Sequence, residues 1–252
     1  MIDSHCHLTD PKFKGEIDAV LGRAQDLGVT RFITIADSLE ESVRSIALAE
    51  RYPQIFCTVG VHPHNAKFWS NGDGRRLREL VVSSARVRAI GEIGLDYHYD
   101  FSQRDAQRKV FRTQLQIAKE LCMPAVVHAR ESLDELMEII EEVEPPKLVL
   151  HCCTERFSAV EPLLSRGYFI SFSGIASYSN AGDVRETIQR CSLSQMMIET
   201  DSPYLAPVPF RGRRNEPAFV LEVAKIIAEV KGISLDMVDR VTSDNAMRFF
   251  EL

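Results

Sequence analysis

The chain has 252 residues, 45% of them hydrophobic, which is enough to fill the core of one large α/β domain. It carries 30 lysines and arginines against 36 aspartates and glutamates, for a formal net charge of −6. This balance argues against a protein that coats nucleic acid through a basic surface, because such binding depends on many Lys and Arg contacts to phosphates. A local basic patch is still compatible with it.

The six cysteines have no framework spacing and no CxxC pair, so we expect them to be reduced. No apolar run approaches the roughly 18 residues of a membrane span, and no charged leader precedes an apolar stretch at the N-terminus. We therefore expect a cytoplasmic protein without membrane attachment and without a stable protein partner.

Eight short apolar runs alternate with amphipathic segments along the chain. The runs that predict strands cover residues 1–6, 31–36, 55–61, 87–94, 124–129, 147–153, 168–174 and 196–200. Apolar residues at spacings of three and four predict helices between them, including 16–28, 39–52, 107–122 and 133–143. The last segment predicts two helices, 217–232 and 234–250, joined at Gly232 with Ser234 as the N-cap.

The alternation of strand and helix predicts an α/β protein. Runs such as 125–129 are apolar on both faces, as in parallel strands covered by helices. A single (β/α)8 TIM barrel over residues 1–252 is the economical interpretation, because no repeat, linker or low-complexity tract divides the chain. An open, doubly wound sheet is the alternative.

Titratable side chains gather at the predicted carboxyl ends of the strands, where barrel enzymes carry their active sites. His5 and His7 are two residues apart in an extended segment, so both imidazoles point to one side. The other members of this set are His62, His64, Glu92, His128, His151 and Asp201. A lone histidine at a strand end is usually structural, but six on one rim predict a metal centre.

Several motifs together resemble the TatD family of metal-dependent deoxyribonucleases, which are amidohydrolase-like barrels. They are IDSHCHL at 2–8, GVHPH at 60–64, GEIGLDY at 91–97, VVHAR at 126–130, HCC at 151–153 and the segment ETDSPYLAPVPFRGRRNEPAFV at 199–220. The resemblance covers the whole chain, to NAMRFF at 245–250. One departure is HCCTE at 151–155, where the family usually has HCFSG, so the loop lacks an aromatic residue and a glycine.

The resemblance implies two divalent metal ions. One would be held by His5, His7, Glu92 and Asp201, and the other by Glu92, His128 and His151, so that Glu92 bridges them. Imidazoles and carboxylates suit zinc or manganese, and carboxylates with water also admit magnesium, so the metal stays open. Such a pair can activate a water and stabilise the attacking and leaving oxygens of a phosphodiester.

Asp201 and Glu92 are the predicted catalytic residues, with Asp201 accepting the proton of the attacking water. Gly91 and Gly94 flank Glu92 and allow other groups to approach closely. Arginine forks match phosphate oxygens and aromatic rings stack bases. The predicted substrate contacts are His62, His64, Arg130, Tyr204, Arg213 and Arg214, although the two histidines could instead orient metal ligands.

The resemblance implies 3'–5' exonuclease action on single-stranded DNA through a metal-activated water. A pocket that grips a few phosphates at a strand end also suits the acidic chain. Two alternatives stay open. One keeps the barrel and the metals but cleaves an acyl bond, as a deacylase of D-aminoacyl-tRNA or another amidohydrolase-type acyl hydrolase would. The other is a metal-stabilised scaffold without catalysis.

Overall fold

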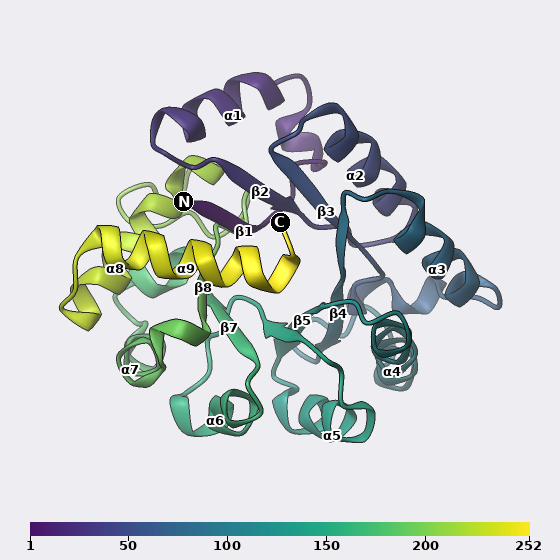
Figure 1. Cartoon of the computed structure of the whole chain (residues 1–252). Helices are drawn as coiled ribbons and strands as arrows, with labels where there is room; N and C mark the ends of the chain where they lie inside the picture. Colours follow the sequence, from purple (N-terminus) through teal and green to yellow (C-terminus); the bar gives the residue numbers. More distant parts are fainter. The chain divides into compact units, whose positions relative to one another are not determined.

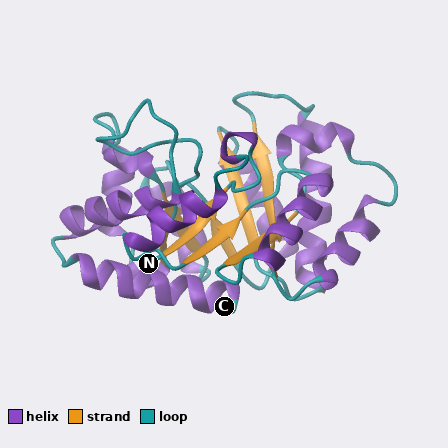
Figure 2. Cartoon of the chain, turned by 90° about the horizontal axis from the view of Figure 1, so that it is seen from above, coloured by secondary structure: helices purple, strands orange, loops and turns teal.

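The computed structural model describes residues 1–252, which form two compact units. The first unit comprises residues 1–34 and 152–252, and the second comprises residues 35–151. In both units parallel strands alternate with helices along the chain (Figure 1, Figure 2). The predicted α/β alternation is therefore present in each.

The first unit contains four strands and five helices. Its strands are β1 (Ile2–Cys6), β2 (Arg31–Thr34), β7 (Phe169–Phe172) and β8 (Met196–Ile198). Its helices are α1 (Ile17–Asp26), α6 (Phe157–Ser165), α7 (Gly182–Arg190), α8 (Val220–Lys231) and α9 (Leu235–Phe250). Short 3-10 turns are η1 (Pro11–Phe13), η3 (Gly174–Ser177), η4 (Leu193–Gln195) and η5 (Pro217–Phe219).

The last strand of the chain lies beside the first. β1 pairs in parallel with β2, and β7 with β8. Beyond β8, Ser202 forms a parallel bridge with Cys6, and its carbonyl oxygen accepts a hydrogen bond of 2.7 Å from the His7 N–H. The Asp201 N–H donates to the His5 carbonyl over 2.9 Å. A pairing of the last strand with the first is typical of a barrel and is foreign to an open, doubly wound sheet.

The second unit contains four parallel strands in chain order. The strands are β3 (Ile55–Val59), β4 (Val87–Asp96), β5 (Ala125–Arg130) and β6 (Leu148–Leu150). The helices are α2 (Leu39–Arg51), α3 (Asp73–Ser83), α4 (Arg104–Glu120) and α5 (Leu133–Val143), and the 3-10 turn η2 covers Pro63–Phe68. β4 runs two residues beyond its predicted end, and most other strands stop earlier than predicted.

Large apolar side chains fill the interior of each unit. Phe32 and Phe172 are fully buried in the first unit, and Leu77 and Leu115 in the second. Burying such a side chain contributes about 1.5–3 kcal/mol relative to leaving it exposed. All five residues of β1 are buried, as expected for a parallel strand covered on both faces. The strand ends that carry the polar side chains are thus rigidly held.

The two predicted C-terminal helices are present, but the first begins later than predicted, because residues 217–219 form the 3-10 turn η5 and α8 starts at Val220. α8 ends at Gly232, whose φ of 66° is the left-handed conformation that glycine adopts without a steric cost. α9 starts after Ser234, whose side chain accepts a hydrogen bond of 3.2 Å from the Met237 N–H. α9 packs against α8, β1 and β8 (Figure 1).

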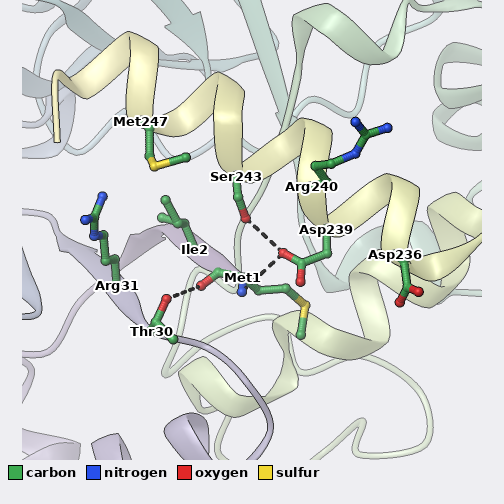
Figure 3. A pocket seen from close by; sticks show the side chains of 9 residues that line it. All are labelled: Met1, Ile2, Thr30, Arg31, Asp236, Asp239, Arg240, Ser243 and Met247. Atoms are coloured by element: carbon green, nitrogen blue, oxygen red, sulfur yellow. Dashed lines mark hydrogen bonds and ion pairs between the residues drawn. The ribbon is translucent and has the colours of Figure 1, made fainter.

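A cavity of about 460 Å³ lies at the amino ends of β1 and β2 (Figure 3). The Met1 ammonium lies 3.1 Å from Asp239 of α9 and donates to the Gly28 carbonyl over 2.7 Å. Ser243 donates to the same Asp239 carboxylate over 2.9 Å. Because barrel enzymes react at the opposite, carboxyl ends of their strands, we assign this cavity no part in catalysis.

Candidate metal centre

One cluster of metal-ligand side chains lies in the first unit, at the carboxyl ends of β1 and β8. The Nε2 atoms of His5 and His7 lie 3.5 and 3.3 Å from Oδ1 of Asp201. The ligand atoms of these three residues all lie within 4.8 Å of one another. Two imidazoles and a carboxylate at this spacing fit a divalent ion such as zinc or manganese.

A buried polar network positions Asp201. The Asp3 carboxylate, in β1, accepts hydrogen bonds from the N–H and Oγ1 of Thr200 over 2.9 and 2.6 Å. The side-chain amide of Asn215 donates to the carbonyls of Thr200 and Tyr204 over 2.8 and 2.6 Å. Asp3, Thr200 and Asn215 are each at most 1% exposed. The segment that carries Asp201 is therefore fastened to β1, the strand that carries the histidines.

A second cluster lies in the second unit around Glu92 of β4. Its Oε1 lies 2.6 Å from Nε2 of His151, 2.9 Å from Nδ1 of His128 and 3.4 Å from Nε2 of His62. His62, Glu92 and His128 form a group whose ligand atoms lie within 4.8 Å of one another. His62, predicted as a substrate contact or an orienting residue, thus lies among the potential ligands.

The electrostatics of the second cluster favour cation binding. Burial raises the pKa of Glu92, but the imidazoles of His151 and His62 and the hydrogen bonds from His128 and His151 hold it well below its usual range. Burial lowers the pKa of His62 to about 4, against the smaller opposing effect of Glu92. At neutral pH the ionised Glu92 carboxylate therefore faces a neutral His62 imidazole, and these are the forms in which both groups bind a metal. The pKa of His128 is raised, because its hydrogen bonds to Asp96 and Glu92 outweigh burial, so a metal would have to displace a proton there.

Asp96, at the end of β4, orients the histidines of this cluster. Its Oδ2 lies 2.9 Å from Nε2 of His64 and 3.1 Å from Nε2 of His128. Burial raises the pKa of Asp96, but these hydrogen bonds outweigh it and hold the pKa far below its usual range. A carboxylate on the outer nitrogen of a ligand histidine fixes the ring and raises its basicity.

Asp96 was missed in the sequence, although a signal was available. Glu92, Gly94 and Asp96 alternate in GEIGLDY, so they point to one face of a strand. The predicted strand ends at residue 94 and therefore leaves Asp96 out. The observed strand includes it and pairs it with Arg130 of β5.

Glycine beside Glu92 is required by the packing of β4 on β5. Gly94 pairs with His128 and has a φ of 143°. A Cβ atom on Gly94 would overlap the carbonyl oxygen and carbonyl carbon of His128. The predicted close approach of another group is confirmed, and that group is the backbone of a proposed metal ligand.

The other predicted substrate residues differ in their surroundings. Tyr204 is 45% exposed, packs edge-on against His7 with ring centroids 5.9 Å apart, and donates from its hydroxyl to Asp10. Arg213 is exposed. Arg214 lies 2.8 Å from Glu16 and 3.0 Å from Glu216, so its charge is already balanced by two carboxylates.

Clusters of histidine and carboxylate at the carboxyl ends of parallel strands, in a chain that pairs its last strand with its first, define a metal-dependent barrel hydrolase. Residues 2–251 match the model of the family described as TatD related DNase. The chain belongs to this family and is a metal-dependent hydrolase.

Relatives and solved structures agree with this assignment. The uncharacterized metal-dependent hydrolase YabD of Bacillus subtilis is 33% identical, with 100% of this chain and 99% of the relative covered. The 3'-5' ssDNA/RNA exonuclease TatD of Cronobacter sakazakii is 33% identical, with 99% and 97% covered. The crystal structure of YJJV, a TatD homologue from Escherichia coli, matches with a TM-score of 0.95 at 29% identity, covering 100% and 98%. The predicted (β/α)8 barrel is thereby confirmed.

None of the helices has the length and apolar character needed to cross a membrane.

Proposed function

We propose that this hydrolase is a nuclease that removes nucleotides from the 3' end of single-stranded DNA. The observation that supports this proposal most directly is the position of the Glu92 carboxylate, which lies 2.6–3.4 Å from three imidazoles. Its pKa is held well below its usual range, so the carboxylate is ionised at neutral pH. Metal-dependent phosphodiester hydrolysis needs such a site. Relatives of 33% and 34% identity, from Cronobacter sakazakii and Enterobacter lignolyticus, are named 3'-5' ssDNA/RNA exonucleases.

We assign the ligands by cluster. His5, His7 and Asp201 would hold one divalent ion, and Glu92, His128 and His151 would hold a second. Magnesium, manganese and zinc are all compatible with these donors. When bound, the ions would supply Lewis acidity and would lower the pKa of a water molecule, so that this water can lose a proton and act as the nucleophile at neutral pH.

The chain itself supplies proton transfer and orientation. Asp201 would accept the proton of the attacking water, because its carboxylate is 15% exposed and lies among the ligand histidines. Glu92 would remain a carboxylate throughout, given its low pKa. Asp96 would hold the rings of His64 and His128 through its contacts of 2.9 and 3.1 Å.

Substrate would be held by the predicted phosphate and base contacts. Exposed Arg130 and Arg213 offer guanidinium groups for phosphate oxygens. The half-exposed ring of Tyr204 offers a stacking surface beside His7. His62 and His64 complete the proposed set, and Arg214, with its two carboxylate partners, would contribute mainly by fixing the loop.

Degradation of a 5'-labelled single-stranded DNA tests the proposal. Chelated protein is supplied with magnesium or manganese, and the parent is compared with Asp201→Asn and with Asp183→Asn, which alters an exposed ion pair on α7. We expect a ladder that shortens from the 3' end only when metal is present. Asp201→Asn should abolish it and Asp183→Asn should not.

No shortening by folded, metal-loaded protein would contradict the nuclease assignment. The same preparation would then be given a D-aminoacyl-tRNA. Release of the amino acid without loss of DNA ends would establish the acyl hydrolase instead, with the same metal ligands.

A further inference from the structure

We propose that Tyr99 and Phe101, in the loop after β4, form a stacking platform for an unpaired nucleobase, with Arg130 placed for the adjoining phosphate. This inference rests on the proposed nuclease function and names the site that receives the base.

The two rings lie nearly parallel and pack against each other. Their centroids lie 5.2 Å apart with an interplanar angle of 17°, so they are stacked. His64 meets both edge-on, with centroid distances of 5.5 Å to Tyr99 and 4.8 Å to Phe101. The guanidinium carbon of Arg130 lies 4.7 Å from the centre of the Tyr99 ring. The rings are therefore held in place by His64 of η2 and Arg130 of β5.

Both rings stay open to solvent. Tyr99 is 47% exposed and Phe101 is 56% exposed, whereas Tyr97, only two residues away, is 7% exposed. The two exposed ring faces are available for contact with a flat ligand. A base stacked on these rings would cover them and gain stacking energy that tolerates any base identity.

The platform is tied to the second metal-ligand cluster through Asp96. One carboxylate oxygen of Asp96, Oδ1, accepts hydrogen bonds from the N–H groups of His98 and Tyr99 over 3.1 and 2.9 Å. The other, Oδ2, contacts His64 and the proposed ligand His128. One buried side chain thus sets both the ligand and the platform, so a base stacked there places its sugar and phosphate beside the cluster.

The charges around the platform favour an anionic chain. Arg130 is exposed and forms no ion pair with a carboxylate. Lys67 donates to the Phe101 carbonyl over 3.0 Å, which places a second cation beside the rings. The neighbouring acids are already paired, Asp100 with Arg104 at 2.8 Å and Glu131 with His98 at 2.7 Å.

Single-stranded nucleic acid fits these features better than duplex does. Stacking on a protein ring needs a free base face, which a paired and stacked base inside a duplex does not offer. Alternating rings and cations are the usual composition of a single-strand site.

The test measures binding separately from cleavage. The probe is a single-stranded octanucleotide with 2-aminopurine next to its 3' end, added to chelated full-length protein so that no cleavage occurs. We compare the parent with Tyr99→Ala, Phe101→Ala and the conservative Phe101→Tyr. Phe157→Ala is the matched control, since that ring also lies under an arginine, Arg190, at 4.2 Å, but on helix α6, which carries no proposed ligand.

The parent and Phe157→Ala should quench the fluorescence equally. Tyr99→Ala and Phe101→Ala should bind about tenfold more weakly or worse, and Phe101→Tyr should bind like the parent. A second probe has an abasic sugar in place of the fluorescent base, and its binding is followed by fluorescence anisotropy of an end label. The parent should bind this probe more weakly than the first. The alanine variants should bind both probes equally, because they have already lost the contact with the base.

Several outcomes would overturn the platform. One is that the alanine variants bind the probe as tightly as the parent does. Another is that the abasic probe loses the same affinity for the parent and for the variants. The third is that duplex DNA binds as tightly as the single strand. A parent that quenches the probe but cleaves no DNA with metal would contradict the proposed nuclease and leave the platform standing. If the parent cleaves DNA and the alanine variants bind the probe as tightly as the parent, the nuclease proposal stands and the platform is contradicted.

Discussion

At the scale of single residues, the site depends on two buried acidic side chains that are not among the proposed metal ligands. Asp96 contacts the outer nitrogen of His128, and Asp3 fastens the segment that bears Asp201. Both are at most 1% exposed, so neither can exchange its partners for water. We therefore expect substitutions of Asp96 and Asp3 to change the positions of the proposed metal ligands.

Asp96→Asn should weaken metal binding at the second cluster. The amide keeps the size of the side chain but loses the charge that two imidazoles contact, so we expect affinity to fall about 10- to 100-fold. Titration of chelated protein with manganese, followed by electron spin resonance of the free ion, measures this. Asp183→Asn is the control, and equal affinity in the two variants would remove Asp96 from the site.

Asp3 should make the chelated protein less stable as the pH rises. Burial raises its pKa to about 8, against the opposing hydrogen bonds from Thr200, whereas the ordinary value is 3.8. The folded state therefore holds a proton that the unfolded state has lost, so this stabilisation is complete below pH 4 and disappears as the pH rises through 8.

Asp3→Asn isolates that effect, because asparagine stays neutral at every pH. Between pH 5 and 7 the free energy of unfolding of the parent, relative to Asp3→Asn, should fall by up to about 1.4 kcal/mol per pH unit. Urea unfolding in a chelator measures both proteins. Parallel pH profiles would show that Asp3 is ionised in the folded protein.

At the scale of elements, the register of β4 on β5 sets the second cluster. Gly94 lies opposite His128, and strand alternation puts Glu92, Gly94 and Asp96 on one face. The proposed ligand His128 and the carboxylate that orients it therefore come from two adjacent strands, and a side chain at position 94 would overlap the His128 backbone.

Gly94→Ala should disturb both folding and metal binding. The added methyl group would overlap the His128 carbonyl, so we expect a loss of about 1–3 kcal/mol in the free energy of unfolding and weaker metal binding. Gly182→Ala, at the start of α7, is the matched control, because no atom lies within 4 Å of the place that its new methyl group would take. Urea unfolding measures the free energy of unfolding of both variants. Equal stability of Gly94→Ala and Gly182→Ala would contradict the steric argument.

Much of the site could be predicted because parallel strands place their carboxyl ends along the same edge of a sheet. Their carboxyl ends share an edge, so His5, His7, His128 and Asp201 could be assigned to one rim from their positions after apolar runs. Ser234 and Gly232 were predictable because caps depend on local chemistry. Asp96 depended on where β4 ends, and strand ends are set by pairing with distant residues.

Other features had no signal in the sequence. Tyr99 and Phe101 lie in a loop, where no periodicity distinguishes an ordered exposed ring from a buried one. The ion pair between Arg214 and Glu16 joins residues 198 positions apart, so this partner could not be inferred from neighbours in the sequence. The close contact of His62 with Glu92 likewise depends on tertiary packing.

At the scale of the whole molecule, the sequence predicts one domain over residues 1–252, and the contacts cluster in two compact units. We expect a chain that folds as one cooperative unit to unfold in a single transition. Manganese at 100 times its dissociation constant should add about 2.7 kcal/mol for a site that exists only in the folded state. Calorimetry of chelated and metal-loaded protein should therefore give one transition, moved to higher temperature by metal. Two separate transitions would contradict the single domain.

The most direct measurement is the metal content of protein that has been loaded with manganese and freed of excess ion by gel filtration. Elemental analysis should find about two ions per chain in the parent and in Asp183→Asn, and about one in His7→Ala and in His128→Ala. Each histidine variant would then report its own cluster. A parent that retains no manganese, zinc or magnesium, or histidine variants that retain as much as the parent, would contradict the assignment of these clusters as the metal centre.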